Sequence, residues 1–151
     1  MPDTNKIRSF LTKWIVDYVK NRDIIEKKIE SIEDKENIVH VKYKDREQFI
    51  LVIPYLENFD FLEKFEKQNY YMVVVLNTKE NLDQLIKNWA RLIGFKFLSV
   101  FFVNPWSSLD KKWIIYPYTH NNIADTSSLS TGLKSMFEMV EPVTESQLNT
   151  I

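Results

Sequence analysis

The sequence has 151 residues, of which 44% are hydrophobic and 27% are charged, and its formal net charge is −1. These values are typical of one folded globular domain, and they exclude a chain that is largely disordered. The near-neutral charge excludes a global basic field for nucleic acid, while a local basic patch stays open.

The scarcity of cysteine and glycine excludes several classes of site. The absence of cysteine rules out disulfides, zinc–thiolate sites and a cysteine nucleophile, and it fits a reducing compartment, so we expect a cytoplasmic protein. With only Gly94 and Gly132, the chain lacks the glycines of a phosphate-binding loop. No apolar run reaches the ~20 residues that span a membrane, and charges interrupt the first stretch, so we expect neither a membrane contact nor a signal peptide.

The first part of the chain shows helical and then strand-forming patterns. Residues 5–20 repeat apolar side chains at the spacing of an amphipathic helix. Residues 22–34 keep a narrower apolar stripe, and we expect a second helix there or a continuation of the first. A hairpin follows, with a half-exposed strand over 38–43 and a buried apolar strand over 48–53. Residues 56–68 predict a short helix.

The middle of the chain predicts a strand–helix–strand unit. Residues 70–76, YYMVVVL, are typical of a central strand, and residues 79–93 carry the apolar face of a helix that Gly94 can end. Residues 97–103 are a second buried strand. A crossover of this length favours parallel pairing of the two strands.

The last part of the chain predicts an edge strand over 113–118, a loop over 119–127 and a helix over about 128–141. The expected order is therefore α–β–β–(α)–β–α–β–β–α. It describes an α/β protein with a mixed sheet of about five strands flanked by helices. We expect one domain over 1–142 and a loose C-terminal tail over 143–151.

This order of elements resembles the core of the restriction-endonuclease-like, or PD-(D/E)XK, nuclease superfamily. That core has a leading helix, a three-strand meander, a helix and a fourth strand parallel to the third, and the resemblance covers roughly residues 5–117. Members place an Asp on the second strand and Glu-x-Lys on the third, where they bind a divalent metal and orient water. Here Val73, Val74, Val75 and Leu76 occupy the Glu-x-Lys positions, and the second strand has no acid. The resemblance thus implies a fold without catalytic residues, and we expect no metal and no other cofactor.

The nearest acidic residues lie beside these two strands. Asp45 and Glu47 precede the second strand, and Glu80 follows the third. If the two strands are antiparallel, Glu47 lies near Asn77, and a displaced acidic pair forms with Lys79 beside it. A divergent metal-dependent nuclease is therefore an alternative function.

Polar residues follow both predicted parallel strands. Asn77, Thr78, Lys79 and Glu80 follow the first, and Asn104 follows the second. Thr78 can cap the next helix and Glu80 suits its first turn, so capping alone explains these two residues. The carboxyl ends of parallel strands are also where α/β proteins bind ligands. This edge is therefore a candidate crevice for a small ligand.

Three more residues are candidates for binding. His120 and Asp125 share a predicted loop, where such a pair can bind metal or move protons, and where Asp125 can equally form an Asx turn or start the last helix. Trp106 lies in the predicted turn NPWSSLD. We expect it either to fold onto the sheet, against Trp113 or Tyr116, or to contact a partner, for example in a homodimer.

Basic residues gather in the first 22 positions, which hold five Lys or Arg against Asp3 and Asp17, and again at Lys111 and Lys112. Such residues can contact phosphates, or they can be solvated. The leading hypothesis is a non-catalytic interaction module of restriction-endonuclease-like architecture that contacts protein or nucleic acid. The alternatives are the divergent nuclease and a small-ligand-binding domain.

Overall fold

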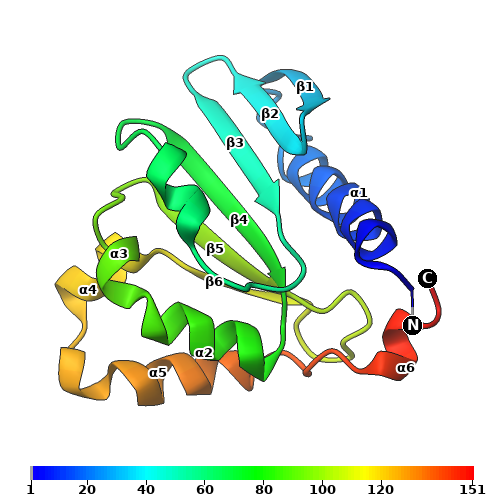
Figure 1. Cartoon of the computed structure of the whole chain (residues 1–151). Coiled ribbons are helices and arrows are strands. Elements are labelled where there is room, and N and C mark those ends of the chain that lie inside the picture. Colours follow the sequence, from blue (N-terminus) through cyan, green and yellow to red (C-terminus); the bar gives the residue numbers. More distant parts are fainter. Residues whose placement is uncertain (1) are drawn as a thin grey trace.

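A six-stranded mixed sheet runs through the computed structural model, which describes residues 2–151 apart from the side chain of Thr126 (Figure 1). The strands are β1 (Ile29–Lys35), β2 (Ile38–Tyr43), β3 (Glu47–Val52), β4 (Tyr70–Leu76), β5 (Leu98–Val103) and β6 (Lys112–Ile115), and they lie side by side in chain order. β1, β2 and β3 form an antiparallel meander, β3, β4 and β5 are parallel, and β6 is antiparallel to β5. The predicted mixed α/β architecture is confirmed, with one strand more than expected.

Helices cover the sheet on both faces. α1 (Thr4–Arg22) and the short α6 (Glu145–Leu148) pack on one face. The other face is covered by η1 (Asp60–Lys64), α2 (Lys79–Lys87), α3 (Trp89–Leu92) and α5 (Leu129–Phe137). α4 (Pro117–Ile123) and the 3-10 turn η2 (Thr126–Ser128) join β6 to α5. None of the helices in the described part of the chain has the length and apolar character needed to cross a membrane.

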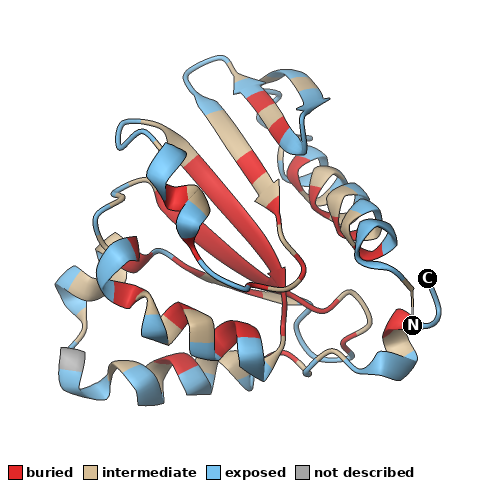
Figure 2. Cartoon of the chain, viewed as in Figure 1, coloured by how far each residue is buried: buried red, intermediate tan, exposed pale blue. Residues whose placement is uncertain are grey.

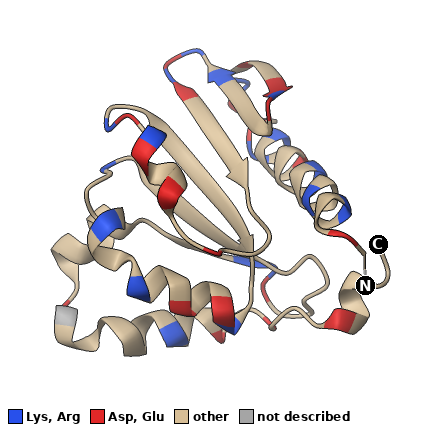
Figure 3. Ribbon diagram, viewed as in Figure 1, with Lys and Arg blue, Asp and Glu red and all other residues tan. Residues whose placement is uncertain are grey.

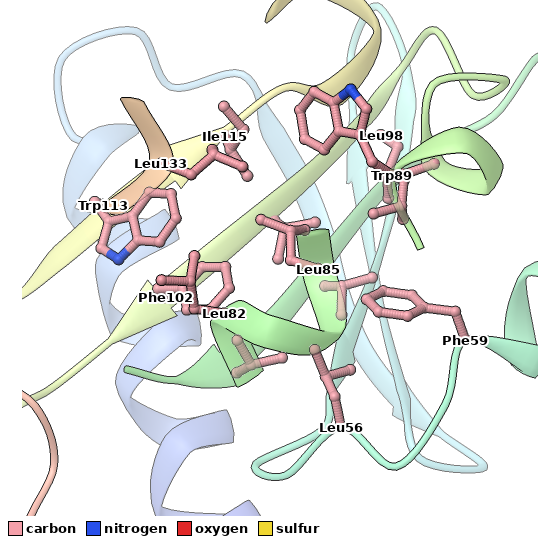
Figure 4. Close-up of a cluster of buried hydrophobic side chains, with 14 of the residues drawn as sticks. Leu56, Phe59, Leu82, Leu85, Trp89, Leu98, Phe102, Trp113, Ile115 and Leu133 are labelled. Atoms are coloured by element: carbon pink, nitrogen blue, oxygen red, sulfur yellow. The ribbon is translucent and has the colours of Figure 1, made fainter. Parts of the chain in front are cut away.

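β4 and β5 form the centre of the core because they have helices on both sides. Every residue of β5 and all but the first of β4 are buried, as Figure 2 shows. Toward α2 and α5 the core contains the cluster drawn in Figure 4, in which Phe102 stacks on Trp113 with ring centroids 4.3 Å apart. This double burial explains why both strands appear in the sequence as continuous apolar runs.

α1 follows directly from its sequence. The carboxylate of Asp3 accepts a hydrogen bond from the Lys6 backbone N–H at 2.9 Å and so caps the helix. The apolar stripe at helical spacing is buried against β2, β3, β4 and β5; its fully covered members are Ile7, Leu11, Ile15 and Val19. Burial of this stripe holds the helix on the sheet.

The helix predicted over 22–34 is wrong, because most of this segment is a loop and strand β1. Ile29 and Ile32 have helical spacing, yet both pack toward α1. A bulge between Ile29 and Ser31 allows this, since the extra residue turns two positions three apart to the same face of the strand. Glu36 and Asn37 then form a tight turn with positive φ angles of 51° and 70°. The hairpin pairing with β2 outweighs the helical spacing of the apolar residues.

Three other boundaries differ from the sequence prediction. The loop expected over 119–127 begins as α4, because Pro117 suits the first turn of a helix. The helix expected over 79–93 is divided at Asn88 into α2 and α3. The tail expected to be loose contains α6, which has a full capping box between Thr144 and Gln147. Its Leu148 side chain is only 4% exposed, so this end of the chain is docked on the sheet.

The docking of α6 can be tested by replacing Leu148 with alanine. We expect a loss of about 2 kcal/mol or more in unfolding free energy, because the substitution empties a buried apolar site. The neighbouring exposed Asn149→Ala variant is the matched control. Urea denaturation measures both. Equal stability of the two variants would show that residues 143–151 do not contribute to the core.

Candidate functional site

The carboxyl edge of the parallel strands is closed by the chain itself. Asn77, at the end of β4, is fully buried, and its side-chain Nδ2 donates to the carbonyl oxygens of Val140 at 3.0 Å and Glu141 at 3.3 Å. Its Oδ1 accepts from Trp113 Nε1 at 2.8 Å, and its backbone carbonyl accepts from the Val143 N–H at 2.9 Å. Figure 1 shows the segment between α5 and α6 passing across the ends of the strands. Asn77 therefore binds the protein's own backbone.

Two further buried asparagines act in the same way. Asn104, after β5, donates to the Glu141 carbonyl at 2.8 Å and accepts from the Trp106 N–H at 3.0 Å. Asn81, in α2, donates to the carbonyls of Pro54 and Leu76 and accepts from the Leu56 N–H. Among the described residues, no buried side-chain polar atom lacks a partner. The amides predicted to line a ligand crevice are thus occupied within the fold.

Thr78, Lys79 and Glu80 have the positions expected of a helix start. The Thr78 hydroxyl accepts from the Asn81 N–H at 3.2 Å, which confirms the predicted cap of α2. Lys79 and Glu80 are exposed in the first turn. These contacts account for Thr78 within the helix and leave Lys79 and Glu80 at the surface beside a closed edge.

His120 and Asp125 have separate local roles. His120 lies in α4, and its ring meets Trp89 edge-on with centroids 5.7 Å apart. Asp125 accepts from the Ser127 N–H at 3.0 Å, an Asx turn, and this bond lowers the pKa of its carboxyl group. No hydrogen bond or ion pair joins His120 to Asp125 in the described part of the chain.

The acidic pair imagined for a nuclease is not formed. β3 and β4 are parallel, with Gln48 opposite Tyr70, so Glu47 lies at the amino edge of the sheet and Glu80 at the carboxyl edge. Glu47 instead contacts His40 Nε2 at 3.1 Å. Among residues 2–151 as described, no group of three or more His, Asp or Glu side chains is placed to hold a metal ion.

Trp106 folds back onto the protein, although not against Trp113 or Tyr116. Its ring stacks on Phe10 of α1 with centroids 5.2 Å apart and an interplanar angle of 4°. The ring is half-buried and borders the core between α1 and the sheet. Trp106 thus joins the β5–β6 connection to α1.

The opposite edge of the sheet carries an open pocket of about 410 Å³. It lies where α1 ends and where β3, β4 and β5 begin, in the upper part of Figure 1. We call its surface the cation–aromatic patch. It consists of Tyr18, Arg22, Tyr43, Arg46, Tyr70 and Phe97, with Lys96 and Lys112 over its rings.

Basic side chains lie over the aromatic rings of this patch. Arg46 is 4.4 Å from the ring centroid of Tyr43 and 5.7 Å from that of Tyr70. Arg22 is 5.7 Å from the ring centroid of Tyr18. Every cation–π contact among the described residues involves a ring of the patch. A guanidinium stacked in this way keeps N–H groups in its plane that can donate to an anion.

Acidic residues also border the pocket, and each has a partner. Asp23 accepts from the backbone N–H groups of Lys28 and Ile29 with its two carboxylate oxygens. The other two pairs are Asp45 with Arg46 at 3.4 Å and Glu26 with Lys28 at 3.9 Å. In the described chain, Arg22, Lys96 and Lys112 form no ion pair. Four basic side chains therefore lie over the rings of the patch, against three acidic side chains at the border of the pocket.

The Tyr43 hydroxyl stays protonated at neutral pH. Burial raises its pKa, and the nearby Arg46 opposes that shift only in part. Tyr43 thus keeps an O–H group that can donate, and the patch gains no negative charge from it.

Figure 3 shows charged residues on helices, turns and outer strands, while β4 and β5 carry none.

A second open feature is an apolar groove of about 740 Å³ along β3, the β3 groove. Its floor includes Ile38, Phe49 and Leu51, and Phe65 forms part of its wall. Phe49 stacks on His40 with ring centroids 4.7 Å apart, and its ring is tilted by 34° against that of Tyr71 at 5.7 Å. The groove exists because α2, α3 and α5 cover β4 and β5 but do not extend over the meander (Figure 1).

The sequence contains no short motif that marks either the patch or the β3 groove. The patch draws its residues from α1, β2, the turn before β3, β4, the approach to β5 and β6, so no short motif contains them. One signal was present: tyrosines and arginines gather at the ends of the predicted elements, as in Tyr43 to Arg46 and Tyr70.

Comparisons with protein-family models, with curated proteins and with solved structures find no match to this chain.

The structural role of Asn77 can be tested against that of Thr78. Asn77→Ala removes the partner of the buried Trp113 N–H and of several carbonyls, so we expect it to cost about 2–4 kcal/mol of unfolding free energy. Thr78→Ala should cost about 1 kcal/mol, as for other helix caps. Thermal or urea unfolding of the two variants gives the comparison. A smaller loss for Asn77→Ala than for Thr78→Ala would return Asn77 to the list of ligand residues.

Proposed function

We propose that this protein is a non-catalytic interaction module that binds single-stranded nucleic acid through the cation–aromatic patch. The observation that supports it is the placing of Arg22, Arg46 and Lys96 over aromatic rings near the amino ends of the parallel strands. Lys112 reaches the ring of Tyr18 from β6. Proteins that bind single strands combine basic side chains, which contact the phosphates, with aromatic rings on which bases stack. Both components are present here at one surface.

A single strand fits this surface better than a duplex does. The rings line a concave pocket, and only an unpaired base can leave its neighbours to stack inside one. Reading the bases of a duplex in its major groove requires a helix or ribbon that projects into the groove. The last turn of α1 instead packs on the sheet through Tyr18, whose ring meets Phe101 edge-on.

We propose a non-catalytic role because of the positions of the Asp and Glu residues in the sheet. The meander expected over residues 38–76, with its Glu-x-Lys positions at residues 73–76, is wrong because β3 and β4 are parallel. The antiparallel meander β1–β3, followed by the parallel strand β4, supports the proposed resemblance only in an alignment shifted by one strand. In that alignment the Asp would lie on β2 and Glu-x-Lys on β3. β2 is IVHVKY, without an acid, and β3 is EQFILV, in which Glu47 has no lysine two residues later. The family resemblance and a cytoplasmic setting remain parts of the proposal.

Binding can be tested with a fluorescently labelled single-stranded oligonucleotide by anisotropy. We expect the protein to bind, and the Arg22→Gln/Arg46→Gln variant to bind about tenfold or more weakly, because two phosphate partners are lost. The slope of log affinity against log salt should fall by about 1.4, the value for two cations on a single strand. The control is Lys87→Gln/Lys134→Gln, which removes two exposed cations from α2 and α5. No binding by the unaltered protein, or equal loss in the control, would contradict the proposal.

A second candidate function is protein binding in the β3 groove. The groove exposes apolar floor residues such as Ile38, which is 36% exposed, and its rim carries two basic and two acidic side chains, Arg8, Lys64, Glu36 and Glu66. Because the charges of the rim cancel, the groove has no net positive potential that would attract phosphates. Its apolar floor suits an apolar protein surface. The partner proposed for this groove is a second copy of the chain.

Sedimentation velocity over a concentration series tests that candidate. If two copies associate through the groove, Ile38→Asp should abolish association, because a charge would be buried in the interface. Ile123→Asp is the control, since Ile123 is 81% exposed and lies on α4, outside the groove. A monomer at every concentration, or association that Ile38→Asp leaves intact, excludes the groove as a dimer interface.

A further inference from the structure

The pocket inside the cation–aromatic patch has a polar floor in an otherwise apolar part of the sheet. Ser99 is the one polar residue of β5, LSVFFV, and it is 4% exposed. Gln48 lies on β3 and is half-buried. Both residues line the pocket: Ser99 lies opposite Met72 of β4, and Gln48 lies opposite Tyr70, two residues earlier on the same strand. Two polar side chains thus face the pocket, although the next positions on this face of β3 and β5 are apolar.

The fold uses only part of the hydrogen-bonding capacity of each of these two side chains. Ser99 Oγ donates to the Tyr71 carbonyl at a long 3.4 Å, which leaves the lone pairs of the hydroxyl without a described donor. Gln48 Oε1 accepts from the Tyr43 hydroxyl at 3.5 Å, the limit of a hydrogen bond, and its amide N–H groups have no partner among the described residues. Asn77, Asn81 and Asn104 at the opposite edge are bound much more completely.

The walls of the pocket suit a planar ring next to an anion. Tyr70 and Phe97 stack on one another with centroids 4.5 Å apart and form one side. Tyr43 lies on the meander side beneath Arg46. Arg22 and Arg46 are exposed side chains at the margin, where a phosphate can remain in contact with water. The volume of about 410 Å³ lies within the range of small-ligand sites.

We propose that this pocket holds one unstacked nucleotide of a bound single strand, with Gln48 and Ser99 as the groups that contact the edge of its base. The inference rests on the proposed function and adds base preference to it. A glutamine amide offers a donor and an acceptor side by side, and it can pair with a base edge that presents the complementary set. Contacts of the flanking phosphates with Arg22 and Arg46 carry no sequence information.

The test compares affinities for short homopolymeric deoxyoligonucleotides of A, C and T under one salt condition. We expect the unaltered protein to distinguish the strongest from the weakest by about fivefold or more, as expected for hydrogen bonds to a base edge. Gln48→Ala and Ser99→Ala should each reduce this ratio toward one and leave the salt dependence unchanged. Gln68→Ala, at an exposed site outside the pocket, is the matched control and should keep the ratio.

The outcomes separate this inference from the proposed function. Equal affinity of the unaltered protein for all three oligonucleotides, or a ratio that survives both substitutions, overturns the base-reading pocket and leaves single-strand binding in place. Absence of binding to any oligonucleotide overturns both. Ser99→Ala conserves volume closely and changes no charge, so an unchanged melting temperature for this variant shows that a lost ratio does not arise from unfolding.

Discussion

The buried amide of Asn77 determines which edge of this protein is open. Its donor group binds carbonyls of the segment after α5, and its acceptor binds the Trp113 indole N–H at 2.8 Å. A buried polar group without a partner costs about 1–3 kcal/mol, so this segment cannot leave the strand ends without a large loss of stability. The same segment then carries α6, with Leu148, to the α1 face of the sheet. One side chain thus connects β4, β6 and the C-terminal region.

Because the carboxyl edge is closed, the accessible pocket of this sheet lies at the amino ends of the parallel strands. In open α/β sheets, ligands tend to bind where the carboxyl ends of strands leave a crevice. Here that position is filled by three asparagines with satisfied amides, while the amino edge keeps a pocket with Arg22, Arg46 and partly bonded polar groups. The contrast rests on hydrogen bonding: polar groups that are fully paired stabilise the fold, and those that are not can bind a ligand.

The uneven cover of the sheet explains the second open feature. β4 and β5 lie between helices and are apolar on both faces, whereas the meander β1–β3 is covered mainly by α1. On the uncovered face, apolar Phe49 and Leu51 remain half-buried and line the β3 groove. The charged outer strand β1 protects the sheet edge from pairing with another chain.

The elements that depend only on neighbouring residues could be predicted from the amino-acid sequence. The apolar stripe of α1, the capping hydroxyl of Thr78 and the continuous apolar runs of β4 and β5 each act within a few residues, so periodicity and capping rules identify them. The parallel pairing of β3 with β4, the bulge that makes β1 a strand, and the convergence of Tyr18, Tyr43 and Tyr70 were decided only by the tertiary structure. The parallel pairing and the convergence of the tyrosines depend on contacts between residues far apart in the chain, and the bulge depends on pairing with the next strand. The periodicity of a segment does not record which backbone that segment will meet.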